Sequence, residues 1–234
     1  MARSSGGFRR AGACSRRRRQ SAHEVQHGFF TASQFFIETD PGGDRSRLRG
    51  GRTHRGVDHA ALSQTGIPRQ PRCDFCQYGG GGAAVFGYGI ITNSTFSGNV
   101  AFHGGGGLLV SDTADLEWVT FSDNLAGVSG SALASTGAVD FKGTLIDGDC
   151  TGTGLTSSGF NLESPGDTCG LDKTSDLPNE ADARLRPLSG YGGPTLTHAL
   201  YSDSSAVDTG FGCTSQDQRR YYRPDLIGCD IGSF

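Results

Sequence analysis

A repeat of about 25 residues constrains the fold of this chain more than any other feature of its sequence. The run GGGAAV at residues 80–85 returns as GGGLLV at residues 105–110, a shift of 25, and more loosely as SGSALA at residues 129–134, a shift of 24. Glycine makes up 38 of the 234 residues without a Gly-X-Y period, which excludes collagen and implies many tight turns. A fixed period of this size is typical of a solenoid, in which equivalent residues of successive repeats stack.

A second register within the repeat gives the same period. ITNSTFSGN at residues 91–99 returns as LEWVTFSDN at residues 116–124, and a degraded copy follows at residues 139–148, with its threonine 24 residues after that of the second copy. Each copy holds two short runs of strand-forming residues, joined by Gly, Asn and Asp, which tolerate the positive φ of sharp turns. We therefore predict an all-β fold in which residues 78–150 form about three coils of a right-handed parallel β-helix.

Stacked coils predict which side chains become neighbours. Large apolar side chains one repeat apart should lie above one another in the core, and amides one repeat apart should form a ladder at a turn. The expected members are Phe96, Phe121 and either Leu145 or Ile146 in the core, and Asn99 and Asn124 in the ladder.

The distribution of charge divides the chain near residue 72. Residues 1–72 contain 14 arginines, no lysine and five acidic residues, a net charge of +9, whereas residues 73–234 carry −12. The first segment has only short apolar clusters, so we expect it to be disordered. Its composition raises the hypothesis that the true start of the coding sequence lies elsewhere. No secretory leader is recognisable, because no apolar run follows the basic residues.

Several motifs follow one another in a fixed order in the second half of the chain. With the GGGLLV and TFSDN runs, this order resembles bacterial right-handed β-helix proteins that carry a choice-of-anchor Q domain. The resemblance covers residues 78–234 and implies a secreted or surface-displayed bacterial solenoid of unassigned activity, similar in architecture to pectate lyases and polymorphic outer-membrane proteins. Tyr191, Ser205 and Arg220 depart from the Asn, Pro and Gly usual in that family. The motifs are GFNLESPGDTCGL at 159–171, LPNEADARLRPLSGYGGPTLTHAL at 177–200, SSAVDTG at 204–210, CTSQDQRRYYRP at 213–224 and CDIGSF at 229–234.

Four cysteines of the tail form two local pairs. Cys150 with Cys169 and Cys213 with Cys229 are 19 and 16 residues apart, and disulfides of such spans would each contribute roughly 3 kcal/mol and indicate an oxidising compartment. We expect residues 151–234 to form a disulfide-stapled, loop-rich cap over the lower end of the coils. Because only the arginine-rich segment precedes the upper end, we expect the chain to be part of a longer β-helix protein.

Candidate binding residues are few. Trp118, which replaces Asn93 of the preceding repeat, should face outward or sideways as a surface aromatic, with sugar stacking as the alternative. Between residues 78 and 169 the only basic side chain is Lys142, which counts against a polysaccharide lyase. The aspartates available for acid–base chemistry are Asp112 with Asp115, Asp123, Asp140, and Asp147 with Asp149, most of them in turn positions that Asp favours for its own hydrogen bonds. The candidate ligand-binding carboxylates among them are Asp112, Asp123, Asp140 and Asp147.

We assign structural roles to the tail residues whose side chains could take part in catalysis. We expect His198 to be packed with a backbone partner, and Asp217 with Arg219 to form a structural ion pair, because neighbouring residues of an extended chain cannot converge on one substrate atom. The sequence lacks the GGxGxDxUx repeat that binds Ca²⁺ at turns, so we expect no cofactor and no metal.

Two functions of different classes remain. The favoured one is a non-enzymatic, adhesin-like module, secreted or on the cell surface, whose partner is an extracellular glycan or a surface protein. The alternative is a glycosidase on the same scaffold, which needs two carboxylates about 5 to 10 Å apart on an outer face. We expect no nucleic-acid partner, and no stretch approaches the roughly 18 apolar residues of a transmembrane helix.

Overall fold

The computed structural model of the protein describes residues 25–26, 29–30, 35–38, 80–223 and 228–234. These residues form strands, turns and loops without a helix, so the predicted all-β class is confirmed. The strands are β1 (Val25–Gln26), β2 (Phe29–Phe30), β3 (Phe35–Glu38), β4 (Ala83–Phe86), β5 (Tyr88–Ser97), β6 (Val100–Ala101), β7 (Leu108–Val110), β8 (Thr113–Ser122), β9 (Leu125–Ala126), β10 (Leu133–Ser135), β11 (Ala138–Lys142), β12 (Leu145–Asp147), β13 (Cys150–Thr151), β14 (Gly154–Ser157) and β15 (Leu162–Ser164).

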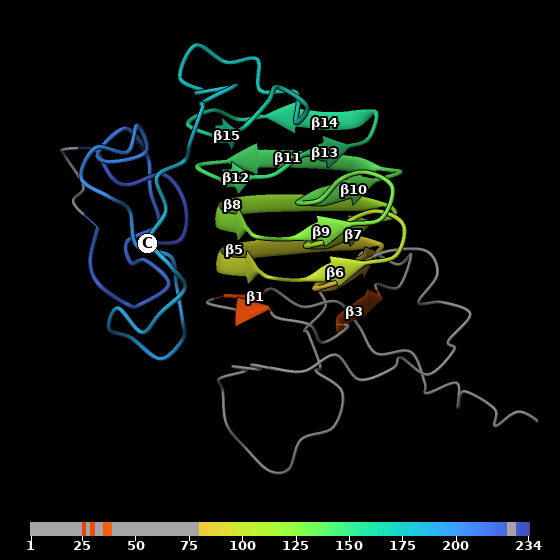
Figure 1. Cartoon of the computed structure of the whole chain (residues 1–234), viewed down its shortest axis with the longest axis horizontal. Helices are drawn as coiled ribbons and strands as arrows, with labels where there is room; N and C mark the ends of the chain where they lie inside the picture. Colours follow the sequence, from red (N-terminus) through yellow and green to blue (C-terminus); the bar gives the residue numbers. More distant parts are fainter. Residues whose placement is uncertain (1–24, 27–28, 31–34, 39–79, 224–227) are drawn as a thin grey trace, which may run out of the picture.

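The strands pair in parallel across equivalent positions of the repeat (Figure 1). The main sheet runs β1-β5-β8-β11-β14, with β2 beside β5 and with β12 and β15 continuing from β8. A second sheet runs β13-β10-β7-β4-β3, and β6 pairs with β9. Phe96 lies beside Phe121, so the predicted 25-residue register is confirmed between the first two copies. Leu108 lies beside Leu133, also 25 residues on, so the shift of 24 predicted for residues 129–134 was wrong by one position.

The third copy keeps the full period of 25. Leu145, not Thr144, pairs with Thr120, so the predicted shift of 24 was wrong by one residue. Alternation of buried apolar residues sets the register of a strand, and Thr144 instead lies at a turn, where its hydroxyl donates to the carbonyl oxygens of Leu116 and Lys142. Matching threonine to threonine was therefore the wrong alignment.

The next turn of the chain is shorter. Leu145 pairs with Leu162 and Leu133 with Cys150, both at a spacing of 17 residues. Parallel pairing thus continues to Ser164, beyond residue 150, where the sequence predicted a change to loops. Gly148 and Asp149 connect β12 directly to β13, and within the described residues β6 and β9 gain no third partner.

A column of stacked side chains fills the core. The rings of Phe96 and Phe121 stack with centroids 4.9 Å apart and planes inclined by 10°. Ile146 pairs with Phe121 and belongs to the same apolar cluster, whereas Leu145 packs in a second cluster with Leu162 and residues of the tail. Of the two predicted continuations, Ile146 is the one that extends the column.

The predicted amide ladder is also present. Asn99 Nδ2 donates to Asn124 Oδ1 at 2.8 Å, the backbone N–H of Asn99 donates to the same oxygen, and Asn124 Nδ2 donates to the carbonyl oxygen of Phe96. Asn161, which sequence analysis missed, makes the same bridge at another corner, to the N–H of Thr144 and the carbonyl of Phe141. Asn124 and Asn161 thus bond backbone groups that the corners would otherwise leave buried without partners.

Residues with positive φ recur at the same period and mark the corners of each repeat. Non-glycine residues are strained in this region, Asn and Asp least, which explains most of the residue types found there. The three columns are Gly80, Gly105 and Gly130; Asn93, Trp118 and Gly143; and Gly98, Asp123 and Gly148.

Part of the segment predicted to be disordered pairs with the stack. Backbone pairing joins β1 and β2 to β5 and β3 to β4. The strands β2 and β3 coincide with the short apolar clusters of this segment, and they pair with an edge of the stack that would otherwise be open. The structure places residues 25–26, 29–30 and 35–38 in strands, and the prediction of disorder for residues 1–72 otherwise falls outside the described residues.

The tail covers the stack in two places. At its end, Leu177 pairs with Leu162, and Thr168 Oγ1 accepts from the N–H of Cys150 at 2.8 Å. The later part, drawn in blue in Figure 1, lies beside the stack, against the second halves of β5 and β8. The tail was predicted to cover the end alone. The outward side chains of these half-strands are small hydroxyls, which provide hydrogen-bond partners for a covering segment.

Both predicted disulfides are present, Cys150–Cys169 and Cys213–Cys229. Disulfides persist in oxidising compartments, so they indicate a non-reducing environment for the folded protein. Among the described residues, no helix has the length and apolarity needed to cross a bilayer.

Candidate functional site

The corner at Asn93 and Trp118 divides the outer face of the two long strands, β5 and β8. After the corner, Thr95 and Thr120 are buried under the tail. Before it, the face is open, and Tyr88 at the start of β5 is 42% exposed. The open half is therefore the part of the main sheet that a ligand can reach.

Polar side chains line this open half across four strands. One register position runs across β5, β8, β11 and β14, where it is occupied by Ile90, Asp115, Asp140 and Thr156. All of these except Ile90 are polar. Their neighbours in sequence, Ile91, Leu116 and Phe141, are fully buried in the core, and alternation along a strand turns the register position outward. We call Tyr88, Asp115, Asp140, Thr156 and Ser158 the open row.

Hydroxyl groups hold both carboxylates of the open row. The Tyr88 hydroxyl on β5 donates to the carboxylate of Asp115 on the neighbouring strand β8. Thr156 and Ser158 donate to the two oxygens of Asp140 at 3.1 and 2.7 Å. Asp115 and Asp140 stand on adjacent strands, which lie about 4.8 Å apart. Their hydroxyl partners lie on opposite sides of the pair, on β5 and at β14. Such a surface offers fixed acceptors and hydroxyls to a polyhydroxylated ligand.

The four predicted aspartates lie in different surroundings. Asp140 is in the open row, whereas Asp112 lies in the turn before β8, where its carbonyl accepts from the N–H of Ala138. Asp123 is an exposed corner residue with φ of 56°. Asp147, at the end of β12, accepts from Ser122 Oγ at 3.0 Å. Asp115 was not selected, although the period alone places it 25 residues before Asp140.

The environment of Asp147 shifts its titration. Burial raises the pKa of Asp147 above its ordinary value, the hydrogen bond from Ser122 opposes that shift, and the charge of Asp123 adds to it. Asp123 and Asp147 are therefore the two predicted aspartates that the structure brings within electrostatic range.

Trp118 is fully buried, so the prediction of a surface aromatic was wrong. The indole does point away from the coil, but the tail covers it: an added Cβ at Gly210 would lie 2.9 Å from its ring, and the guanidinium carbon of Arg223 lies 5.2 Å from the ring centre. A ligand cannot stack on a ring that is enclosed in this way.

His198 is packed as predicted. Its Nδ1 lies 2.8 Å from the carbonyl oxygen of Arg186, which fixes the proton on Nδ1, and its Nε2 lies 2.8 Å from Ser97 Oγ. A serine beside an oriented imidazole is the arrangement of an activated nucleophile, but both side chains are buried. The pair therefore attaches the tail to the sheet. Asp217 and Arg219 form the expected ion pair at 2.6 Å.

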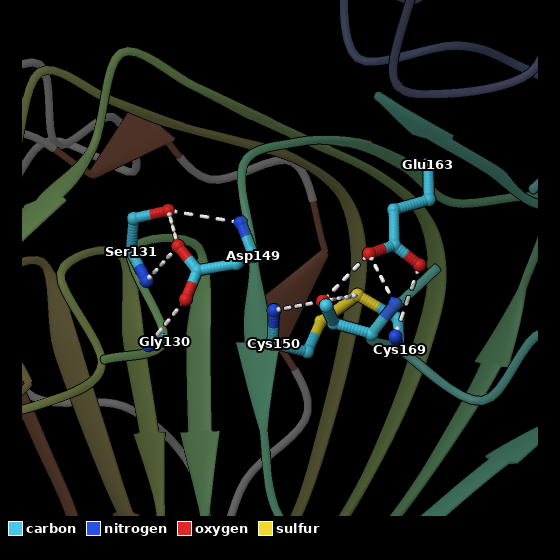
Figure 2. The surroundings of a disulfide bond; sticks show 7 residues. Gly130, Ser131, Asp149, Cys150, Glu163 and Cys169 are labelled. Atoms are coloured by element: carbon cyan, nitrogen blue, oxygen red, sulfur yellow. Dashed lines mark hydrogen bonds between the residues drawn. A yellow bond between two sulfur atoms is a disulfide. The ribbon is translucent and has the colours of Figure 1, made fainter. Parts of the chain in front are cut away.

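Two further carboxylates hold turns in place (Figure 2). Asp149 accepts hydrogen bonds from the N–H groups of Gly130 and Ser131 at 2.7 and 3.0 Å and from the Ser131 hydroxyl. Desolvation raises the pKa of Asp149, but these hydrogen bonds outweigh it, so the pKa lies below its ordinary value. Buried Glu163 accepts from the N–H groups of Thr168 and Cys169. Across the described part of the chain, no group of three or more His, Cys, Asp or Glu side chains is placed to hold a metal ion.

A second exposed surface is apolar. Val100 of β6 and Leu125 of β9 pair with each other and are 61% and 62% exposed, and Phe102 and Val128 beside them are more exposed still. Grouped exposed apolar side chains are typical of protein contact surfaces. The repeat could have indicated them, because Val100 and Leu125 are one period apart.

Comparison of the chain with protein-family models, with curated proteins and with solved structures finds no match.

Proposed function

We propose that this chain is a right-handed parallel β-helix module of a secreted or cell-surface protein, related to the bacterial choice-of-anchor Q proteins, and that it binds an extracellular glycan without transforming it. The parallel pairing at a period of 25 supports the β-helix. The disulfides support an extracellular location.

The open row is the observation that carries the binding proposal. It repeats polar groups along the stack at the spacing of the strands, so one extended polymer can contact several coils at once. Its hydroxyl–carboxylate pairs are ordered before a ligand arrives, which reduces the entropy lost on binding. Sugars, which carry a hydroxyl on most carbons, match a row of fixed acceptors.

Binding to a panel of immobilised polysaccharides tests this proposal. Asp140→Asn should weaken binding about tenfold, because a hydrogen bond to a charged acceptor is replaced by a neutral one. Asp167→Asn is the matched control, since Asp167 is exposed in the loop after β15, and it should bind as the wild type does. A panel without any bound glycan, or equal loss in both variants, would refute the proposal.

A glycosidase is the second candidate, and the adjacency of Asp115 and Asp140 is the observation in its favour. Retaining glycosidases use two carboxyl groups about 5 to 5.5 Å apart, which is near the strand spacing. Incubation of the full chain with pectin, alginate and neutral polysaccharides should then release reducing ends, and Asp115→Asn should abolish the release. Binding without release would leave the non-enzymatic function.

A further inference from the structure

An exposed tyrosine of the tail lies against two arginines, away from the open row. The ring of Tyr201 is 40% exposed, and the guanidinium carbons of Arg184 and Arg186 lie 5.3 and 4.8 Å from its centre. Such stacking fixes a planar guanidinium against an aromatic face. Neither the sequence repeat nor the open row accounts for this group.

The backbone that carries these residues is held firmly. Leu185 and Leu200 pair in antiparallel fashion, the N–H of Arg186 donates to Ala199 at 2.7 Å, and that of Tyr201 donates to Arg184 at 2.9 Å. The carbonyl of Arg186 also holds His198, which is bonded to the main sheet. The tyrosine and both arginines are therefore positioned by the fold before any ligand binds.

The two arginines differ in what they already contact. Arg184 makes a two-pronged contact with Asp203, at 3.2 and 2.6 Å, and lies 3.6 Å from Asp182. Arg186 has no carboxylate partner among the described residues, and only its Nε is engaged, by the carbonyl oxygen of Leu200 at 3.3 Å. Its terminal nitrogens are therefore free to donate to an incoming anion.

We propose that Arg186 and Tyr201 form a binding site for a carboxylated sugar, a uronate residue of an extracellular polysaccharide. The planar fork of Arg186 matches the two oxygens of a carboxylate, and the part of Tyr201 left exposed beside the two guanidinium groups can contact the sugar. Asp182 and Asp203 disfavour a dianion such as phosphate more than a singly charged carboxylate. The site lies outside the open row, so the two binding proposals fail separately.

The test uses the full chain and oligosaccharides of glucuronate and of galacturonate, each beside its carboxyl-reduced, uncharged form, in calorimetric titrations. The charged form should bind roughly tenfold more tightly than the reduced form, the size of effect expected of a charge-assisted pair. Arg186→Gln should remove that difference, and Tyr201→Leu should weaken both forms. Arg220→Gln is the control, because Arg220 is exposed and contacts neither residue of the site.

Three outcomes would overturn the proposal. They are equal binding of charged and reduced oligosaccharides, unchanged binding by Arg186→Gln, and displacement of the uronate by inorganic phosphate at equal concentration. Thermal melts of each variant separate loss of the site from loss of the fold. The open row can fail to bind neutral glycans without affecting this result.

Discussion

Replacing Asn124 by alanine tests whether the amide ladder holds successive repeats together. The side chain makes three hydrogen bonds, from the backbone N–H and Nδ2 of Asn99 to its Oδ1 and from its Nδ2 to the carbonyl of Phe96. Asn99 is fully buried and Asn124 is only 4% exposed, so water cannot easily replace the lost partners. Each buried group left without a partner costs about 1 to 3 kcal/mol, so Asn124→Ala should lower the unfolding free energy by at least about 3 kcal/mol.

Urea unfolding of Asn124→Ala, Asn99→Ala and the double variant measures this effect. Because the two amides bond each other, the double variant should lose less than the sum of the single losses, by about 1 kcal/mol or more. Asp167→Ala, an exposed loop substitution, should change the unfolding free energy by less than about 0.5 kcal/mol. A loss below about 1 kcal/mol for Asn124→Ala, or strictly additive losses, would refute the ladder as a source of stability.

Three further predictions follow from buried contacts. Gly143→Ala should lower the unfolding free energy by about 2 kcal/mol or more, because its φ is 59° and the new Cβ would lie 2.4 Å from the ring of Trp118; unfolding followed by fluorescence of this single tryptophan checks it. Burial raises the pKa of Asp147, so the folded state binds its proton more tightly and stability falls as pH rises from 3.8 through the raised value; Asp147→Asn should remove that fall, as denaturant titrations from pH 3 to 7 would show. Replacing Cys150 and Cys169 together by serine should cost about 3 kcal/mol in the same assay, and an unchanged midpoint would contradict it.

The sequence predicted those contacts that repeat. Phe96 over Phe121 and Asn99 over Asn124 follow from one fixed period, because a residue type that recurs at constant spacing in a solenoid meets its own copy. The third copy was misaligned by one residue, because its Thr144 matches Thr120 in type but not in surroundings. The shorter turn after Leu145 repeats no motif, so only the pairing of strands reveals it.

Contacts between the tail and the sheet were beyond sequence analysis. The hydroxyl of Thr95 bonds Gln218, and that of Ser97 bonds His198, across separations of 123 and 101 residues. No local pattern marks such pairs, since each requires the whole chain between them to be placed first. The burial of Trp118 was missed for the same reason, because the segment that covers it comes more than 80 residues later in the chain.

The side chains of the long strands themselves determine which half of the sheet the tail can cover. Beyond the corner the outward residues include Thr95 and Thr120, whose small hydroxyls are satisfied by Gln218 and Ser233 when the tail covers them. Before the corner the outward carboxylates would lose hydration under the same cover. Among the described residues no cation of the tail forms a salt bridge with them, although the charge of Asp140 acts on Lys173. The tail therefore packs where burial costs little, and the half of the sheet that carries Asp115 and Asp140 stays uncovered.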